Sequence, residues 1–499
     1  MAVWDYLVTL MPQLLLVLFA LMLPGLDYLF KNKRMLSWAA LAPLIGLAVV
    51  MMSWLFLGLW EPEPSMISLL EINVFSGLFT LVFLFVGIVV VLGSPEFIKD
   101  DRNQGEYYAL ILLAIVGMTV VAEAADLIAL FVGLEIAGIS SFALSGFRKS
   151  EKRSAEAATK YFIVGGFSSA LTLFAISIYY GVAGTTQIIA VEPVLAGSIP
   201  SMGEVDARPI LALATVLLMA GFGFKVAMVP FHMWAPDVYE GAPTPISGML
   251  AAASKKMGVA AFFKVFLIGL IVTKTDWQAA IAVLAVLTMT VGNLIAISQT
   301  NIKRMLAYSS VAQAGYLLLV LPVATQYAVA GGLFHVFTHA FMKSGAFMVV
   351  AAMTAVAIGE KLEDFKGLSR RSPFLSMAMT LFLLSLAGIP PLAGFASKFV
   401  LFSSAVYESF EPGQGWLVWL AVAGVLNSAL SLYYYARVIK YMYMDRGASE
   451  EKVRVPPMLA AAIVFAVVMV VLIGLAPGTI VDACLEAAKG FPALPEGWR

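Results

Sequence analysis

One stretch of the chain combines residue types that could carry protons through a membrane. Lys225 lies in an apolar run, MAGFGFKVAMVPF, that otherwise predicts a membrane-buried helix; Pro230 interrupts the run, and His232 follows the interruption. A charged side chain at the bilayer centre costs about 2.5–3.5 kcal/mol on insertion scales, so an intramembrane lysine indicates a functional site. Backbone that a proline frees at this depth must line protein or a watery cavity. An amine, a broken helix and an imidazole in this order predict part of a proton path.

Further titratable residues surround this stretch. Lys255 and Lys256 are adjacent on the next apolar helix, so we expect at most one of them to face a path. Glu135 lies near the middle of the apolar segment 126–147. If Glu135 and Lys225 approach each other, each keeps the other charged, and separating them would release the lysine's proton. The same residues are also compatible with a static ion pair that only fixes helix packing.

A second group of such residues lies in the C-terminal half. His335, His339 and Lys343 recur at four-residue steps in FHVFTHAFMKSG, which predicts one polar stripe along a helix. This stripe is costly inside hydrocarbon unless it faces a hydrated interior. Lys398, in GIPPLAGFASKF, would complete the path. A histidine titrates near neutrality and suits a relay between lysines, although His232 could equally be a helix-end or core residue.

The composition indicates which elements must position these residues. Of 499 residues, 61% are hydrophobic and only 12% are charged. Because about 20 apolar residues are needed to cross a bilayer, we expect an all-α, polytopic membrane protein of about fourteen transmembrane helices. The predicted spans are 7–28, 36–59, 72–93, 107–123, 126–147, 157–183, 209–231, 244–272, 277–299, 303–323, 327–358, 373–408, 415–443 and 457–478.

The basic residues predict the orientation of these spans. Twenty lysines and arginines fall in connections on one side, four on the other, and seven inside predicted helices. Positive residues concentrate on the cytoplasmic side, so both termini are expected on the non-cytoplasmic side. The first apolar run lacks a basic region and a cleavage site before it, which indicates a retained span. Lys160 and Lys264 lie nearer to helix ends, where a lysine can extend to the interface.

Several classes of site are not expected in this chain. The single cysteine, Cys484, excludes an internal disulfide and a cysteine-ligated cluster, and three histidines without a CxxC motif argue against a metal site. Gly221 and Gly223 lie within a helix and lack the strand and spacing of a dinucleotide fingerprint. Basic and acidic residues balance at 31 each, and no feature predicts nucleic-acid binding. We therefore expect no cofactor and no metal in this chain.

The two halves of the chain share a pattern. GFGFKVAMVPF (221–231) and GIPPLAGFASKFVLF (388–402) each place a lysine beside a proline break, in the seventh and twelfth predicted spans. An odd offset reverses the direction in the membrane, so the repeat would be inverted. Matching broken helices in two inverted halves indicate a transport site near the bilayer midplane.

Three segments carry a family resemblance. WAPDVYEGAPTPISGMLAAASK (234–255), NIKRMLAYSSVAQAGY (301–316) and LAGIPPLAGFASKF (386–399) are similar to the N-type antiporter-like membrane subunit of respiratory complex I, NADH-quinone oxidoreductase subunit N, and its close relatives. The similarity runs through the fourth to thirteenth spans. The DVYEG sequence is typical of the N type rather than of its sister subunits.

The resemblance implies an architecture and four essential residues. By motif, the essential residues of the family fall on Glu135, Lys225, Lys255 and Lys398. The implied fold has two inverted five-helix repeats, each with a broken helix. The expected domains are a three-helix N-terminal segment (1–106), a first repeat (107–272), a second repeat (273–443) and a C-terminal helix and tail (444–499).

The resemblance also implies an activity and partners. It implies a proton-translocating subunit in a prokaryotic cell membrane, driven by quinone reduction elsewhere in the complex. The quinone, flavin and iron–sulfur clusters would bind to partner subunits, and M-, L-, K- and J-type membrane subunits would be neighbours, with soluble redox subunits reached indirectly. The sequence does not distinguish among NADH, a deazaflavin and ferredoxin as the electron donor. The alternatives are a multisubunit sodium/proton antiporter and a scaffold without transport, which fits poorly with seven intramembrane lysines.

Overall fold

The protein is almost entirely helical in a computed structural model of the chain. The structure describes residues 10–59, 66–67, 69–188, 207–356, 358–447 and 451–491. A single two-stranded hairpin, β1 (Met66–Ile67) with β2 (Leu70–Glu71), is described besides the helices. The chain ends that were expected on the non-cytoplasmic side lie outside the described residues.

The N-terminal part forms the first three predicted spans. They are α2 (Met11–Leu29), α3 (Arg34–Leu57) and α4 (Val74–Gly93), and the short α5 (Pro95–Ile98) follows. Helix α4 begins where Asn73 and Ser76 form a reciprocal capping box, which satisfies backbone donors at the helix start. Helices α2 and α4 both pack against α6 (Gln104–Glu123), so this segment is joined to the helices that follow.

The next helices surround the first break. Asp126 caps the start of α7 by accepting from two backbone amides. The helices are α7 (Leu127–Ser145), α8 (Lys152–Ala183), α10 (Arg208–Val226) and α11 (Trp234–Gly241). The seventh span was predicted to run to residue 231, but α10 ends at Val226, before Pro230. The reason is local: Ala227 adopts a left-handed conformation (φ 59°), which cannot continue a right-handed helix.

The eighth predicted span, 244–272, is a helix with changes of winding. It comprises α12 (Thr244–Met249), a π-helical turn η1 (Leu250–Ser254), α13 (Lys255–Lys264) and a second π-helical turn η2 (Val265–Gly269). A 3₁₀ turn, η3 (Ile271–Thr273), then leads to the next helix. Hydrophobic pattern alone does not reveal π turns, which occur frequently at functional sites.

The C-terminal half is organised around α17, which is buried along its length. Helix α17 packs against α4, α12, α19, α20, α22 and α23. The elements of this half are α14 (Lys274–Ser298), α15 (Ile302–Leu318), α16 (Val320–Val323), α17 (Gln326–Ala355), η4 (Leu362–Phe365), α18 (Leu368–Arg371), α19 (Pro373–Ala387), α20 (Ala393–Glu408), η5 (Gly415–Leu417), α21 (Val418–Tyr443), α22 (Pro457–Leu475) and α23 (Gly478–Ala488).

The predicted break within 373–408 is present. Helix α19 ends at Ala387, Gly388 takes a left-handed conformation (φ 89°), and α20 starts at Ala393. Each break therefore follows the same plan: a helix, a left-handed residue, a proline and a second helix. Glycine adopts this conformation without a steric cost, so Gly388 suits the site.

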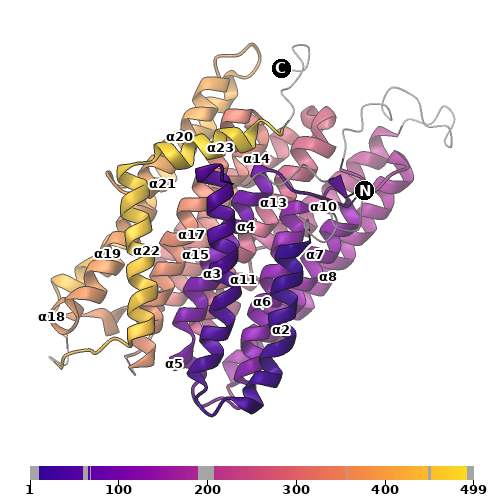
Figure 1. Cartoon of the computed structure of the whole chain (residues 1–499). Coiled ribbons are helices and arrows are strands. Elements are labelled where there is room, and N and C mark those ends of the chain that lie inside the picture. The colour runs from indigo at the N-terminus through magenta and orange to yellow at the C-terminus, as the bar shows by residue number, and fades with distance from the viewer. Residues whose placement is uncertain are drawn as a thin grey trace.

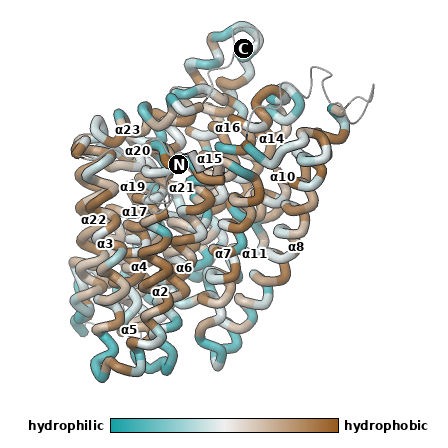
Figure 2. The backbone as a smooth tube through the Cα atoms, turned by 45° about the vertical axis from the view of Figure 1, so that its right-hand side comes forward, coloured by the Kyte–Doolittle hydropathy of each residue, from teal (hydrophilic) through white to brown (hydrophobic). Residues whose placement is uncertain are grey.

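The helices form a bundle that could cross a membrane. In the described part of the chain, twelve helices are long and apolar enough to span a bilayer, and α19 is a shorter apolar helix. The helices run side by side (Figure 1), and their middle parts are largely hydrophobic while the turns at the lower end are hydrophilic (Figure 2). Helix α23 was not predicted; it lies across the upper ends of the bundle and packs against α4 and α17.

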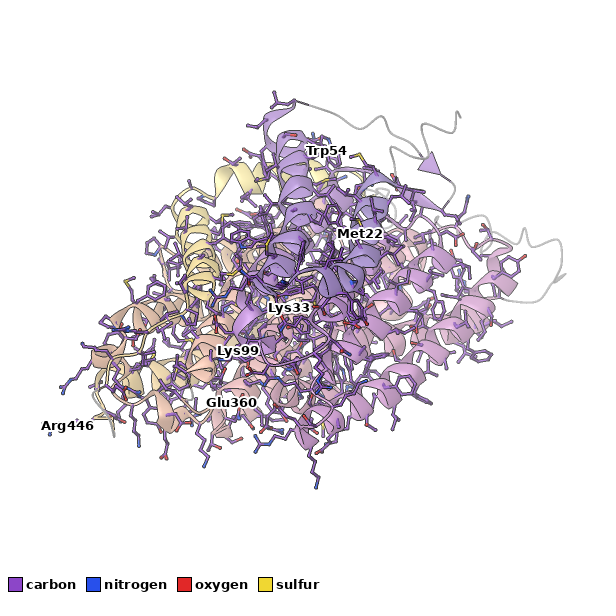
Figure 3. All side chains as sticks on the ribbon, turned by 60° about the horizontal axis from the view of Figure 1, so that its bottom comes forward. Met22, Lys33, Trp54, Lys99, Glu360 and Arg446 are labelled. Atoms are coloured by element: carbon purple, nitrogen blue, oxygen red, sulfur yellow. The ribbon has the colours of Figure 1, made fainter. Side chains whose placement is uncertain are left out.

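The basic connections gather at one end of the bundle. The loops that carry Lys33, Lys99 and Arg446 lie on the lower side of Figure 1, which is turned forward in Figure 3. Ion pairs join these connections, including Lys303 to Glu360 at 3.3 Å and Arg34 to Glu96 at 3.4 Å. We call this end the basic face and the other the opposite face.

Candidate functional site

The first break places Lys225 at the end of a helix. Lys225 is in the last turn of α10 and is 6% exposed. A helix C-terminus carries partial negative charge and favours a cation, so this position suits an ammonium group. The side chain crosses to α7, where Nζ lies 3.5 Å from the carbonyl of Leu134 and beside Gly138. A Cβ at Gly138 would lie 3.1 Å from this nitrogen, so a glycine makes room for the amine.

Glu135 is near Lys225 but does not pair with it directly. Its carboxylate accepts a hydrogen bond from Ser169 of α8 at 2.5 Å and is only partly buried. The amine of Lys225 lies within electrostatic range of this carboxylate. The structure thus brings the two predicted residues together on neighbouring helices without a direct ion pair between them. A modest movement would change their interaction strongly, because Coulomb energy in a protein interior varies steeply with distance.

Past the break, His232 and Lys255 face a common region. Both ring nitrogens of His232 and Nζ of Lys255 are buried without a hydrogen-bond partner in the described part of the chain. The Lys255 amine lies over the ring of Tyr239, 5.5 Å from its centroid, as in a cation–π contact. Because the helix is broken, Lys225 and His232 do not share a helical face, and His232 instead lies within electrostatic range of Lys255.

Lys256 points in another direction and contacts the second half. Its Nζ lies 2.6 Å from Nδ1 of His339, a hydrogen bond between α13 and α17. We expected at most one of the adjacent lysines to face the path; the structure gives each its own titratable neighbour. The family motif ends at Lys255, so the resemblance did not single out Lys256, which contacts a titratable residue in the structure. Its position beside Lys255 was visible in the sequence, but its direction depends on the π turn η1 just before it.

The predicted polar stripe on α17 lies on one buried face. The rings of His335 and His339 are 5.8 Å apart, and both residues, like Lys343, are fully buried. Nε2 of His335 donates to the amide oxygen of Gln313 at 3.0 Å, and Nδ1 contacts the hydroxyl of Ser397 at 3.0 Å.

Lys343 continues this face toward the neighbouring helices. Its amine donates to the hydroxyl of Ser309 at 2.7 Å and to the carbonyl of Leu306 at 3.2 Å. Ser309 also hydrogen-bonds to Tyr435 on α21. The neutral hydroxyl and amide groups of α15 thus connect titratable side chains, a role that the sequence left open against simple packing between helices.

Lys398 lies at the second break. Its amine donates to the carbonyls of Leu386 and Ala387 at 2.7 and 3.3 Å, and to the hydroxyl of Ser428 at 2.8 Å. The two carbonyls are the last ones of α19, which the break leaves without helical partners. Gln313 also donates to the Leu386 carbonyl at 3.2 Å. The Leu386 oxygen therefore accepts from both Lys398 and Gln313, and Gln313 in turn accepts from His335.

Two hollows lie near the elements that carry these residues. A cavity of about 390 Å³ at the basic face is lined by charged residues and by Thr244, at the start of the helix that carries Lys255. A crevice of about 520 Å³, mainly apolar, lies between α20 and α21 and reaches Lys398. Of these titratable residues, Lys398 therefore lies beside a groove.

The DVYEG sequence anchors α11. Asp237 pairs with Lys160 and with Arg304, each at 2.7 Å, and Glu240 pairs with Arg304 at 2.9 Å. Lys160, which the sequence left open, thus binds a carboxylate near the basic face. These ion pairs tie the helix after the break to α8 and α15, so they position His232 and Lys255 indirectly.

The chain is similar in sequence and in fold to known membrane subunits. Residues 124–431 match the family model described as "NADH:quinone oxidoreductase/Mrp antiporter, TM". The chain is 45% identical to F(420)H(2) dehydrogenase subunit N of Methanosarcina mazei, over 96% of this chain and 97% of that protein. It is 40% identical to NADH-quinone oxidoreductase subunit N of Heliobacterium modesticaldum, over 92% and 93%. A chain of respiratory complex I from Thermus thermophilus superimposes with a TM-score of 0.77 and 30% identity, covering 94% of this chain and 98% of that one.

Proposed function

Because this chain belongs to the NADH:quinone oxidoreductase/Mrp antiporter family of membrane subunits, we propose that it is the proton-translocating N-type subunit of a complex-I-type quinone oxidoreductase. Both of these relatives bear subunit N names, and the similarity covers nearly their whole length. Quinone reduction in other subunits supplies the driving force.

One observation carries this proposal: buried amines and imidazoles extend from the first broken helix to the second, beside the partly buried carboxylate of Glu135. We call these side chains together the row: Glu135, Lys225, His232, Lys255, Lys256, His339, His335, Lys343 and Lys398. Ionisable residues in a membrane interior are costly and mark proton or ion pathways. A scaffold would gain nothing from so many of them.

We assign the two halves of the row different tasks. In the first half, Glu135 tunes Lys225, and the proton passes by the break to Lys255, with His232 as an intermediate acceptor. Lys255 and Lys256 then transfer charge from the α11 side to the α17 side, because the Lys255 amine lies over Tyr239 and the Lys256 amine contacts His339. In the second half the hydrogen bond from Lys256 to His339 starts the transfer toward Lys398.

Neutral groups complete the second half. Gln313 and Ser397 hold His335 in place, and Ser309 holds Lys343. Ring nitrogens of His232 and His339 that have no protein partner in the described residues provide sites for bridging water. Lys343 lies within electrostatic range of Lys255, Lys256 and Lys398, so a proton arriving at one amine promotes release from the next.

The architecture that we propose has fourteen spans and two inverted five-helix repeats, 107–272 and 273–443, between a peripheral segment (1–106) and a C-terminal part (444–499). The shared plan of the two breaks supports the repeats, and the helix from α12 to η2, with the α19–α20 pair, supplies the two spans beyond the twelve long helices. The basic face is cytoplasmic by the positive-inside rule, which places both termini on the other side.

We propose that the partners are M-, L-, K- and J-type membrane subunits, in a prokaryotic cell membrane. The soluble redox subunits are reached indirectly. Flavin, iron–sulfur clusters and quinone bind to partner chains and supply the electron chemistry there. This chain contributes the relay alone.

Proton movement by the purified complex in liposomes tests the proposal. We expect quinone reduction to drive proton movement without sodium. The alternative, a multisubunit sodium/proton antiporter, predicts sodium-dependent proton movement without donor or quinone. Observing only the latter would overturn the proposal.

A further inference from the structure

A second group of buried ionisable side chains lies outside the row. Glu123 is the last residue of α6 and Lys264 the last of α13, and each is 3% exposed. They lie where α2, α6 and α13 meet. The relay described above uses neither residue, yet a buried ionisable group in a membrane is costly and indicates a function.

The two residues are linked through one backbone segment. Nε2 of Gln13 donates to Oε2 of Glu123 at 2.6 Å. Nζ of Lys264 donates at 2.8 Å to the carbonyl of Ala124, the residue directly after Glu123. Lys264 is within electrostatic range of both Glu123 and Glu71, and its other neighbour is the ring of Phe75 at 5.8 Å.

An unpaired acceptor lies at this site. Oε1 of Gln13 is buried without a hydrogen-bond partner in the described residues, and the whole side chain is 5% exposed. Such an oxygen beside a carboxylate can accept a hydrogen bond only from an added donor. A protonated Glu123 carboxyl, or a water that delivers the proton, is a donor of this kind.

The site adjoins the face opposite the basic face. Helix α6 starts near α5 at the basic face and ends at Glu123 toward the other end of the bundle (Figure 1). The segment after it is hydrogen-bonded to the β hairpin, because the backbone amide of Ala125 donates to the carbonyl of Leu69 at 2.9 Å. Glu71 on this hairpin is only partly buried, so it connects the site to the surface.

Helix α13 couples this site to the relay. Lys255 and Lys256 are at its start, and Lys264 at its end, eight residues beyond Lys256 and therefore about 12 Å along the axis. The residues between them, 257–263, are buried and apolar, so no side chains conduct a proton between the two ends. At an effective dielectric constant of about 20, one unit charge at this distance changes a proton affinity about tenfold.

We propose that Glu123 and Lys264 form a second proton-binding site, open past Glu71 to the face opposite the basic face, that regulates the relay by charge. This inference rests on the proposed function. A proton taken up from that face neutralises Glu123 or charges Lys264. The added positive charge lowers the proton affinity of Lys256, so acidity on the receiving side slows further uptake. By linkage, a proton on Lys256 equally favours release from the site.

The test uses two substitutions of Glu123 in the assembled complex. One removes the titratable group and keeps the hydrogen bond, and the other does the reverse. Glu123→Gln keeps the shape and the hydrogen bond to Gln13 but cannot titrate. Glu123→Asp can titrate but is too short to keep that bond. Quinone-reduction rates are measured in proteoliposomes while the pH at the opposite face is varied, with the other face held constant and the membrane potential collapsed.

We expect acid at the opposite face to lower the quinone-reduction rate of the wild-type complex. This decrease should be larger than in Glu123→Gln, by a factor of up to about ten. The Asp variant should keep the wild-type dependence. If Glu123→Gln behaves as wild type while Glu123→Asp does not, the carboxylate only latches α2 to α6 and the inference fails.

Pumping by Lys225→Ala is measured in the same vesicles. This measurement distinguishes a failure of the regulatory site from a failure of the relay. Loss of pumping in Lys225→Ala with no effect of Glu123→Gln overturns only the regulatory site. Wild-type pumping in Lys225→Ala overturns both.

Discussion

Replacing Lys256 by methionine tests the contact that joins the two halves of the row. Lys256→Met preserves the length and burial of the side chain but removes the amine, which lies 2.6 Å from Nδ1 of His339. The imidazole would then lose its hydrogen bond at Nδ1, and its Nε2 has no protein partner in the described residues either.

The size of the effect follows from the type of bond. A hydrogen bond that involves a charged group contributes about 1.5–3 kcal/mol. If the proton crosses between the halves at this contact, the barrier rises by a similar amount. Because about 1.4 kcal/mol corresponds to a factor of ten in rate, transfer should slow about 10- to 150-fold.

Proteoliposomes that contain the purified complex provide the assay. Quinone reduction and the pH of an entrapped dye are followed together, which gives both the rate and the proton-to-electron ratio. Lys440→Met is the matched control, because Lys440 is an exposed lysine of α21. Pumping by Lys256→Met at the rate and ratio of the control would refute a path through His339.

Three further predictions concern other parts of the chain. Glu135→Gln should reduce turnover and alter its pH profile, because it removes the charge within electrostatic range of Lys225 with little change of shape; an unchanged profile would favour a packing role. Asp237→Asn breaks two partly exposed ion pairs, so calorimetry should show a loss of about 1 kcal/mol of stability, whereas no change would mean that α11 is held by packing alone. Burial raises the pKa of the Cys484 thiol, so maleimide should label this single cysteine at least about tenfold more slowly in the folded complex than in denaturant, and equal rates would contradict the packing of α23.

The sequence predicted the helical class and both breaks, because apolar length and prolines are local signals. Most span boundaries agree within a few residues. It missed the end of α10 at Val226, since a left-handed alanine leaves no mark in the hydrophobic pattern. It also missed α23, which is too short to be recognised as a span, and the π turns on either side of α13.

The candidate residues could be proposed from the sequence because ionisable groups stand out in apolar helices. Their partners could not be predicted, because a hydrogen bond between helices depends on relative rotation and height. Lys256 and His339 are 83 positions apart, and only the packed structure shows that they touch. Glu123 was overlooked because it lies at a predicted helix end, where a carboxylate is normally exposed.

The proton-to-electron ratio of the complex with Lys225→Ala is the most direct test of a relay through this amine. We expect the chain still to insert and assemble, since alanine is easily accommodated beside Gly138, while coupled proton pumping is lost or sharply reduced. An assembled Lys225→Ala complex with the wild-type ratio would contradict a relay through this amine.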